Sequence, residues 1–262
     1  MNIDLEITVA LVKQIARSQG VVLLNRWPNV GEISFKNRRD FATQVDLDIE
    51  SNIKSALSSQ FPDHGLSGEE TGGQNPGSEY QWLIDPIDGT KYYAAQSSLF
   101  SVSVGLLYRG EPVLGVVYAP TSDQCFYACS GSGAFLDGHR LSGPHVAEVS
   151  DVIANVDTPN THNLSAAERE WFERKLILLT RNFYRIRALG LGSLSACWLA
   201  TGALDAYIDL TGYVKPQDLA AGRVILKEAG LRLEYLDAGV GPPKLLAAPK
   251  AIWEPLKSLL LE

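Results

Sequence analysis

The segment WLIDPIDGTKYY, Trp82–Tyr93, decides how this chain is interpreted. An apolar strand is expected to stop at Asp85, and Pro86 is expected to turn the chain there. Asp88 then points back toward the same spot, and the Gly-Thr pair that follows can open a helix. Two carboxylates three residues apart across a tight turn suit one or two Mg²⁺ ions, which prefer oxygen ligands. The backbone N–H groups after such a turn suit a phosphate.

The same residues could form nothing more than a turn, because Asp-Pro and Asp-Gly are common turn dipeptides. Further acidic residues weaken that alternative. The pair Glu69-Glu70 lies in an upstream loop, and Asp46 and Asp218 lie at the expected starts of two helices. Acidic residues beside apolar segments are costly unless something compensates their charge. The four acidic clusters together therefore indicate a metal site.

The composition is typical of a globular protein and limits the possible partners. The chain has 262 residues, 45% of them hydrophobic and 20% charged, which excludes disorder and a coiled coil. Its 23 basic and 30 acidic residues give a formal net charge of −7. A general nucleic-acid binder would carry a basic face, so no nucleic-acid polymer is expected as a partner. A small anionic substrate held by metal ions is compatible with this charge.

The N-terminal segment, 3–26, predicts an amphipathic helix and no secretory signal. Asp4 and Glu6 occupy the place where a signal peptide carries positive charge, and Lys13 and Arg17 interrupt the apolar pattern. No uninterrupted apolar run approaches the ~18 residues of a membrane helix. We therefore expect a cytoplasmic protein that does not bind membranes.

The three cysteines are expected to be free thiols. Cys125 and Cys129 lie in one strand-like run, QCFYAC, and four strand steps span ~13 Å, too far for a disulfide. Free thiols fit a reducing compartment. The four histidines are scattered, and no Cys/His spacing suggests zinc.

The first half is expected to fold as two helices followed by an antiparallel meander. The helices are predicted at 3–26 and from Asp46 onward, where apolar residues recur at helical spacing. Composition and alternation predict a short strand at 40–45, a loop at 71–80, strands at 81–85, 98–107, 112–119 and 124–130, and a hairpin at 131–141.

The second half reads as a smaller α/β unit. Ser165 and Glu168 have the spacing of a capping box at the start of a helix. Further helices are predicted at 193–203, 218–229 and 251–261, and strands at 203–210 and 244–249. No long linker marks the boundary near 145–150, so we expect one unit, 1–262, with sub-domains of about 1–147 and 148–262.

Several motifs, in order, resemble the inositol monophosphatase superfamily. WLIDPIDGT resembles its W-x-x-D-P-[IL]-D-G-T signature, and LSGEE (66–70) its upstream G-E-E motif. The resemblance runs from about residue 36 to 232 and includes DFATQVD (40–46), PVLGVVYAP, GSGAFLDG, ATGALDAYIDL and PQDLAAGRVILKEAG. A chance match to all of these is negligible.

The resemblance implies both a fold and an activity. The fold is an α/β layered sandwich, as in inositol monophosphatase and fructose bisphosphatase, with the meander sheet in the first half. The activity is a Mg²⁺-dependent, lithium-sensitive phosphomonoesterase, with two or three Mg²⁺ ions, acting on a small polyol or sugar-type phosphate. A homodimer is expected.

Other functions on this fold stay open. The substrate could instead be a 3′,5′-bisphosphate nucleotide, fructose 1,6-bisphosphate, histidinol phosphate, or another sugar or nucleoside phosphate. A non-catalytic binding or regulatory protein is a third possibility, which the loss of a metal ligand would indicate. No such ligand is missing from the sequence.

The resemblance also assigns roles to individual residues. The metal ligands that it implies are Glu69, Asp85, the Ile87 carbonyl, Asp88 and Asp218. The catalytic group is Asp46, Thr90 and Glu69, of which Thr90 and Asp46 orient and deprotonate the attacking water. The phosphate and substrate contacts are Asp88, Gly89, Thr90, Gly192, Ser193 and Asp209, and supporting positions around the ligands are Glu70 and Lys36.

Two residues depart from the family pattern. Gln217 stands where the family usually has Trp, directly before the ligand Asp218. Lys91 follows the DGT motif where Thr is frequent, and a Lys there is more typical of the bisphosphate-nucleotidase branch; the alternative is an exposed helix residue. Asp209 matches an acid that contacts substrate hydroxyls, although a strand-end acid without a partner is the alternative.

Overall fold

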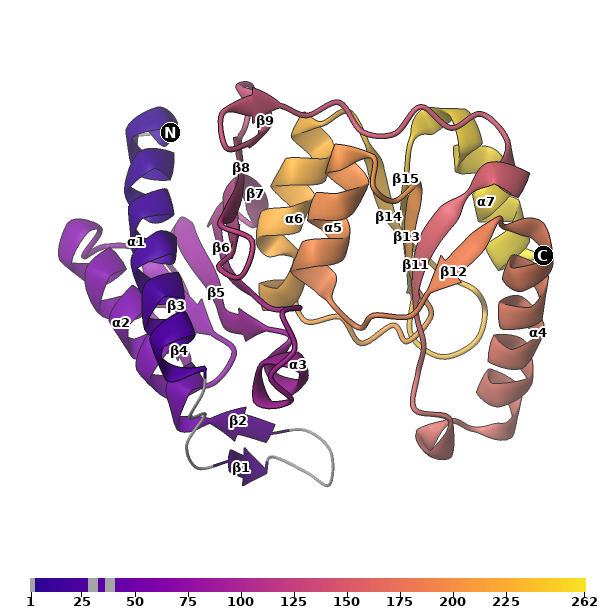
Figure 1. Ribbon diagram of the computed structural model, residues 1–262, viewed down its shortest axis with the longest axis horizontal. Coiled ribbons are helices and arrows are strands. Elements are labelled where there is room, and N and C mark those ends of the chain that lie inside the picture. The colour runs from indigo at the N-terminus through magenta and orange to yellow at the C-terminus, as the bar shows by residue number, and fades with distance from the viewer. Residues whose placement is uncertain (1–2, 28–32, 36–40) are drawn as a thin grey trace.

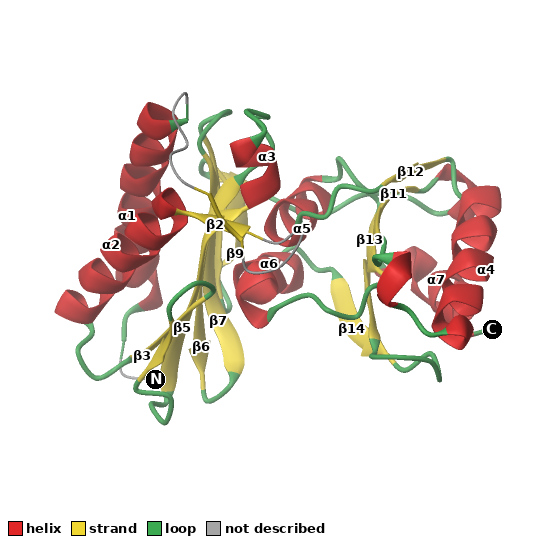
Figure 2. Ribbon diagram, turned by 90° about the horizontal axis from the view of Figure 1, so that it is seen from below, coloured by secondary structure: helices red, strands yellow, loops and turns green. Residues whose placement is uncertain are grey.

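Two large β-sheets and three layers of helices alternate along the long axis of the molecule (Figure 1). The computed structural model describes residues 3–27, 33–35 and 41–262, and Lys36 lies outside the described residues. Seen from below, two long helices cover the outer face of the first sheet, a second pair fills the space between the sheets, and a third pair covers the far side (Figure 2). The predicted α/β layered sandwich is confirmed.

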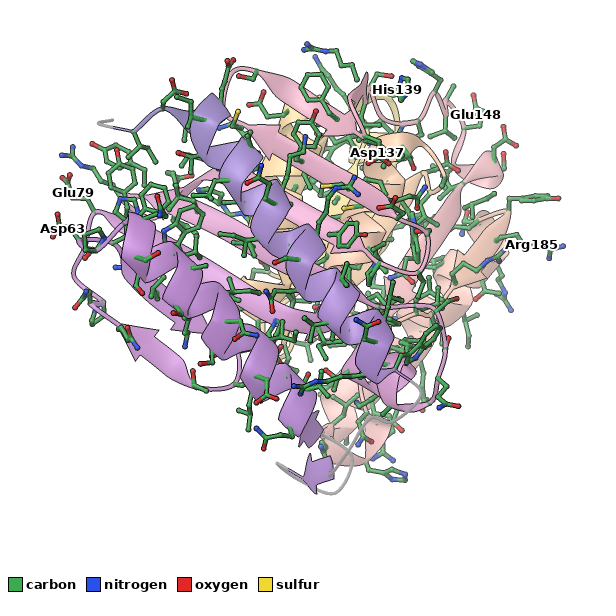
Figure 3. The ribbon with its side chains drawn as sticks, turned by 60° about the vertical axis from the view of Figure 1, so that its left-hand side comes forward. Asp63, Glu79, Asp137, His139, Glu148 and Arg185 are labelled. Atoms are coloured by element: carbon green, nitrogen blue, oxygen red, sulfur yellow. The ribbon has the colours of Figure 1, made fainter. Side chains whose placement is uncertain are left out.

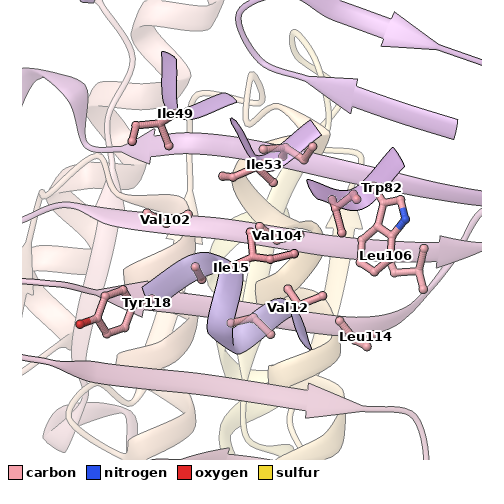
Figure 4. Packing of buried hydrophobic residues seen from close by; sticks show 14 of the residues in the cluster. Val12, Ile15, Ile49, Ile53, Trp82, Val102, Val104, Leu106, Leu114 and Tyr118 are labelled. Carbon is pink, nitrogen blue, oxygen red and sulfur yellow. The ribbon is translucent and has the colours of Figure 1, made fainter. Parts of the chain in front are cut away.

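The outer helices are α1 (Leu5–Arg26) and α2 (Gln44–Gln60). The side chain of Asp4 caps α1 by accepting from the N–H groups of residues 6 and 7. Apolar residues of both helices pack on the sheet, among them Val12, Ile15, Ile49 and Ile53 (Figure 4). Within the described residues, α1 alone is long and apolar enough to span a membrane by length and composition, but its apolar face already packs against the sheet.

The first sheet contains the predicted meander, with three differences from the sequence prediction: the strands at 65–68 and 72–74 were not predicted, and the strand that contains Asp85 runs further than predicted. Its order is β10-β9-β8-β7-β6-β5-β3-β4, antiparallel except that β3 runs parallel to β5. The strands are β3 (Gly65–Gly68), β4 (Gly72–Gln74), β5 (Tyr80–Asp88), β6 (Ser101–Tyr108), β7 (Glu111–Ala119), β8 (Gln124–Cys129), β9 (Gly133–Leu136) and β10 (His139–Arg140). The segment predicted to be only a loop, 71–80, therefore contains β4, which pairs with β3 at the sheet edge.

The strand predicted to stop at Asp85 instead runs on to Asp88. Asp85 pairs with Ser103 and Asp88 with Ser101, and the register shifts between them. Pro86 has no N–H to give to a ladder, and a bulge accommodates it without ending the strand. The bulge, and not a turn, therefore sets the spacing of the two carboxylates. A separate pair, β1 (Ile33–Phe35) and β2 (Phe41–Thr43), is antiparallel, and β2 accounts for the strand predicted at 40–45.

The central helices α5 (Gly192–Thr201) and α6 (Pro216–Glu228) come from the second half of the sequence, yet α6 packs on the first sheet. Glycines of that sheet allow the approach. A Cβ on Gly115 would lie 2.4 Å from the carbonyl oxygen of Ala221, and a Cβ on Gly105 would meet the side chain of Ala220 at 2.7 Å. The division at residue 147 stays a prediction.

The second sheet is mixed. Its order is β12-β11-β13-β15-β14. The strands β12, β11 and β13 run parallel to one another, and β15 runs antiparallel to both of its neighbours, β13 and β14. Sequence analysis predicted β13 (Ala206–Asp209) and β15 (Lys244–Ala248) but not β11 (Ile153–Asp157), β12 (Arg185–Arg187) or β14 (Arg232–Leu236). Helices α4 (Ala166–Asn182) and α7 (Lys250–Leu261) form the outer layer, and the predicted capping box of Ser165 and Glu168 opens α4.

The close packing of α6 on the first sheet gives a stability prediction. Gly115→Ala is expected to lower the free energy of unfolding by about 1–3 kcal/mol, because the added methyl group would overlap the backbone of α6. Gly77→Ala is the matched control, because a Cβ there meets nothing within 4 Å. Urea denaturation of both variants measures the effect, and equal stability of the two would contradict the packing described.

Candidate metal and phosphate site

Three carboxylates from three separate elements meet between the sheets. Glu69 follows β3, Asp85 lies in the β5 bulge, and Asp218 lies in the first turn of α6. One oxygen of each lies within 4.8 Å of the other two. Many charged side chains stay on the outside of the molecule, such as those labelled in Figure 3, but Asp85 is only 2% exposed. Carboxylates this close repel one another, and a bound cation would offset that repulsion.

The electrostatics of the cluster and its donor atoms fit a divalent metal ion. Burial raises the pKa of Asp85, and the neighbouring carboxylates of Glu69, Asp88 and Asp218 raise it further. Burial and the charge of Asp218 likewise raise the pKa of Asp88. Carboxylate and carbonyl oxygens are the ligands that hard cations such as Mg²⁺ prefer. The cavity beside them is about 200 Å³ and is also lined by Ile87, Gly89, Thr90 and Lys91.

Asp88 contacts the N-terminus of α5. Its Oδ2 accepts from the N–H groups of Ser193, at 3.0 Å, and Leu194, at 3.3 Å. These bonds oppose the rise in its pKa, because a helix N-terminus favours negative charge. The Ser193 hydroxyl donates to the carbonyl oxygen of Asp218 at 2.7 Å. Ser193 therefore links two predicted metal ligands, and its predicted contact with substrate stays a prediction, as does that of Gly192, which lines the neighbouring pocket.

The predicted pair of Asp46 and Thr90 is brought together. Asp46 is fully buried in the first turn of α2, and Thr90 begins the short helix α3 (Thr90–Ala94). The Thr90 hydroxyl oxygen lies 3.2 Å from Asp46 Oδ1 and 3.0 Å from the Ile87 carbonyl oxygen, so its proton can go to either. Gly89 precedes α3 at φ +93°, where a Cβ would lie 2.6 Å from the carbonyl oxygen of Leu99. Only glycine fits this position without strain.

Glu50, which sequence analysis missed, holds the loop that carries Glu69 and Glu70. Its fully buried carboxylate accepts from the N–H groups of Glu70, at 2.7 Å, and Thr71, at 3.0 Å, and from the Thr71 hydroxyl. Lys54 Nζ pairs with it at 2.8 Å. Burial alone would raise the pKa of Glu50, but the bonds from Lys54, Thr71 and Glu70 outweigh burial and lower it. The sequence signal was an acid and a base, i and i+4, beside the apolar stripe of α2.

A larger pocket of about 550 Å³ adjoins the carboxylates. Asp209 lies in its wall, 1% exposed, and its carboxylate accepts from the N–H groups of Thr211, at 2.8 Å, and Gly212, at 3.1 Å. Asp209 thus has partners, unlike the isolated strand-end acid of the alternative, and its contact with substrate stays a prediction. The pocket is also lined by Lys91, Tyr92, Asp157, Thr158, Leu189, Gly190, Tyr207, Tyr213 and Val214.

Asp157 is a second buried acid in that pocket which sequence analysis missed. It pairs in register with Asp209 across the parallel strands β11 and β13. It accepts from the N–H of Gly190 at 2.8 Å and from the Tyr207 hydroxyl at 3.1 Å. Burial raises the pKa of both Asp157 and Asp209. No motif marks Asp157, and its strand was not predicted from the sequence.

The two departures from the family pattern have definite places. Gln217, in the first turn of α6, donates to the Ser67 hydroxyl of β3 at 3.2 Å and so links the second half to the first sheet. Lys91 is exposed on α3, as one alternative expected, and also lines both cavities.

Comparison of the chain with known proteins shows its family. The model of the inositol monophosphatase family matches residues 4–260. The chain belongs to the inositol monophosphatase family. A fructose-1,6-bisphosphatase/inositol-1-monophosphatase of Aquifex aeolicus is 33% identical over 247 residues, 92% of this chain and 90% of that protein. A histidinol-phosphatase of Mycobacterium tuberculosis is 37% identical over 205 residues, 76% of each chain.

Solved structures agree with the family assignment. The extragenic suppressor protein suhB of Bartonella henselae has a TM-score of 0.88 and 25% identity, and the match covers 97% of this chain and 98% of that one. The family and these relatives identify the chain as a phosphoric monoester hydrolase, so it is an enzyme. The substrate differs among the relatives and does not follow from membership of the family.

The burial of Glu50 gives a second prediction. Glu50→Gln is expected to lower the free energy of unfolding by about 3 kcal/mol, because it leaves Lys54 without its buried counter-charge. Glu79→Gln is the matched control. Glu79 forms a solvent-exposed ion pair with Arg109, and removing its charge should leave the free energy of unfolding unchanged. Urea denaturation at neutral pH compares the variants, and a Glu50→Gln protein as stable as the control would contradict the role of Glu50.

Proposed function

We propose that this enzyme is a Mg²⁺-dependent phosphomonoesterase that hydrolyses a small polyol or sugar-type phosphate. The observation that supports this most is the partly buried carboxylate cluster beside the Thr90–Asp46 pair, opening on a polar pocket. Two or three Mg²⁺ ions would be held by Glu69, Asp85, Asp88, Asp218 and the Ile87 carbonyl. Bound Mg²⁺ supplies charge neutralisation at the phosphoryl oxygens and lowers the pKa of a coordinated water.

The chain's own groups would then handle the proton and the phosphate. Thr90 Oγ1 would take a proton from the attacking water as it passes its own proton to Asp46 Oδ1, 3.2 Å away. The backbone N–H groups of Gly89 and Thr90 hold the phosphoryl oxygens, and Glu69 assists in placing the water. Glu70 acts through its N–H bond to Glu50, which holds the loop in place.

The larger pocket would receive the leaving alcohol. Buried Asp157 and Asp209 and the hydroxyl of Tyr207 suit a group that offers hydroxyl donors. A leaving group that carries an amine, as in histidinol phosphate, is the second candidate, because a carboxylate-rich wall favours a cation. A second phosphate group would meet one cation, Lys91, among the described residues that line the pocket. Lithium sensitivity, a homodimer and a cytoplasmic location complete the proposal.

Metal dependence tests the proposal directly. Phosphate release from β-glycerophosphate should require Mg²⁺, and Asp85→Asn should reduce it by more than about 100-fold, because a central ligand loses its charge. Millimolar Li⁺ should inhibit the wild-type enzyme. Phosphate release is followed by a colorimetric assay with and without EDTA. Turnover that persists in EDTA, or in the Asp85→Asn variant, would contradict the metal-dependent mechanism.

The stability of the Asp85→Asn variant is expected to separate its loss of activity from unfolding. The raised pKa of Asp85 makes the folded protein hold that proton more tightly than the unfolded chain. Its stabilising contribution is complete below the unfolded pKa of about 4 and is lost as pH rises through the folded pKa. In EDTA at pH 8 the variant should therefore melt at or above the wild-type temperature, with the difference shrinking toward pH 5.

Substrate choice should depend on Asp209. Asp209→Asn is expected to reduce kcat/KM for the preferred polyol phosphate about 10-fold or more, because the charged acceptor of its hydroxyls is lost. It should hardly affect p-nitrophenyl phosphate, which lacks those hydroxyls. Both substrates are assayed with wild type and variant at saturating Mg²⁺. Equal losses on the two would mean that Asp209 only holds the loop at Thr211 and Gly212.

A further inference from the structure

Lys215 contacts two members of the carboxylate cluster at once. Its Nζ lies 2.6 Å from Glu69 Oε1, and its backbone N–H donates to Asp218 Oδ2 at 3.3 Å. The Lys215 side chain is 45% exposed, whereas that of Glu69 is 15% exposed. The Lys215 side chain thus lies between solvent and the Glu69 carboxylate. Of the described residues, it is the one whose ammonium group forms an ion pair with Glu69 in the structure.

Lys215 also ends the loop that forms one wall of the larger pocket. This loop, 210–215, joins β13 to α6, and Thr211, Tyr213 and Val214 line the pocket. Near the start of the loop, Asp209 accepts hydrogen bonds from the N–H groups of Thr211 and Gly212. At the end of the loop, the ammonium group of Lys215 is bonded to Glu69 of the carboxylate cluster. The loop is therefore tied to the substrate pocket at one end and to the metal site at the other.

An ammonium group and a divalent ion cannot both sit close against the same carboxylate without strong repulsion. Glu69, whose Oε1 is bonded to Lys215, also offers a carboxylate oxygen that lies within 4.8 Å of oxygens of Asp85 and Asp218. Lysine is a flexible, well-hydrated point charge, so its side chain can leave the site and remain solvated. Its partial exposure in the structure leaves that exit open.

We propose that Lys215 is a built-in counter-ion that competes with the metal for Glu69 and so couples metal loading to the 210–215 loop. The inference rests on the proposed metal site and adds a residue that sets metal affinity. An orienting role is the opposite possibility: if Lys215 only held Glu69 in place, its removal would weaken metal binding. The two roles therefore predict opposite signs for one measurement.

The test is Mn²⁺ binding to the metal-free protein, measured by titration calorimetry and by electron paramagnetic resonance. Lys215→Met should bind Mn²⁺ roughly two- to tenfold more tightly than wild type, because the competing charge is gone. Lys215→Arg keeps the charge and should stay close to wild type. Lys91→Met is the matched control: Lys91 lines the same cavity, and its loss should have a smaller effect.

Each outcome decides the proposal. Tighter binding by Lys215→Met alone supports it, whereas unchanged or weaker binding, or equal tightening by Lys91→Met, overturns it. If wild type releases phosphate with Mg²⁺ but Lys215→Met does not bind Mn²⁺ more tightly, this inference fails and the proposed function stands. If wild type neither binds metal nor releases phosphate, both fail.

Hydrogen exchange of the loop provides an independent readout of the coupling. In the wild type, adding Mg²⁺ should speed amide exchange in the segment 210–217, because Lys215 no longer holds the loop to Glu69. In Lys215→Met the segment should exchange fast before Mg²⁺ is added and change little afterward. Exchange that is the same in both proteins, with and without Mg²⁺, would overturn the coupling between metal loading and the loop.

Discussion

Repulsion among buried carboxylates is the constraint on which the rest of this structure depends. Asp85 and Asp88 are almost fully buried, and Asp218 and Glu69 lie against them. In a low dielectric such a cluster destabilises the fold unless positive charge or N–H donors face it. The fold supplies both. Because the compensation is incomplete, the pKa values of Asp85 and Asp88 stay raised, and a cation at the site would offset the remaining repulsion.

Helix N-termini supply much of that compensation. Asp46 and Asp218 lie in the first turns of α2 and α6, and Asp88 accepts from the first N–H groups of α5. Each helix end carries a partial positive charge that favours a carboxylate. The helices come from distant parts of the sequence, and glycines in β6 and β7 let α6 lie close enough to bring its end to the site. The packing of the helices on the sheets thus produces both the layered architecture and the charge environment of the candidate site.

The sequence was sufficient for the residues whose signal is local. The D-P-I-D-G-T segment, the capping box of α4 and the alternating strands of the meander were recognisable without the fold. The bulge at Pro86 was not, because pairing with β6 overrides the turn preference of Asp-Pro. Glu50 was missed because its partners, at 70 and 71, are brought to it only by the tertiary fold. Strand length does not explain why β11 and β14 were missed, because the predicted strand β13 is shorter than either.

Substrate choice is harder to predict from the sequence than the candidate metal site, because its residues also come together only in the fold. The candidate metal and phosphate ligands lie on the bulge and at helix starts, which strong motifs mark. The larger pocket is lined by one to three residues from each of several strands, helices and loops, among them β11, β13 and α3. Asp157 and Asp209 meet across a parallel strand pair, and that register exists only in the folded chain. Relatives with different named substrates can therefore share the first set of residues and differ in the second. The loop ended by Lys215 contacts both sets, so we expect changes there to alter metal binding and substrate choice together.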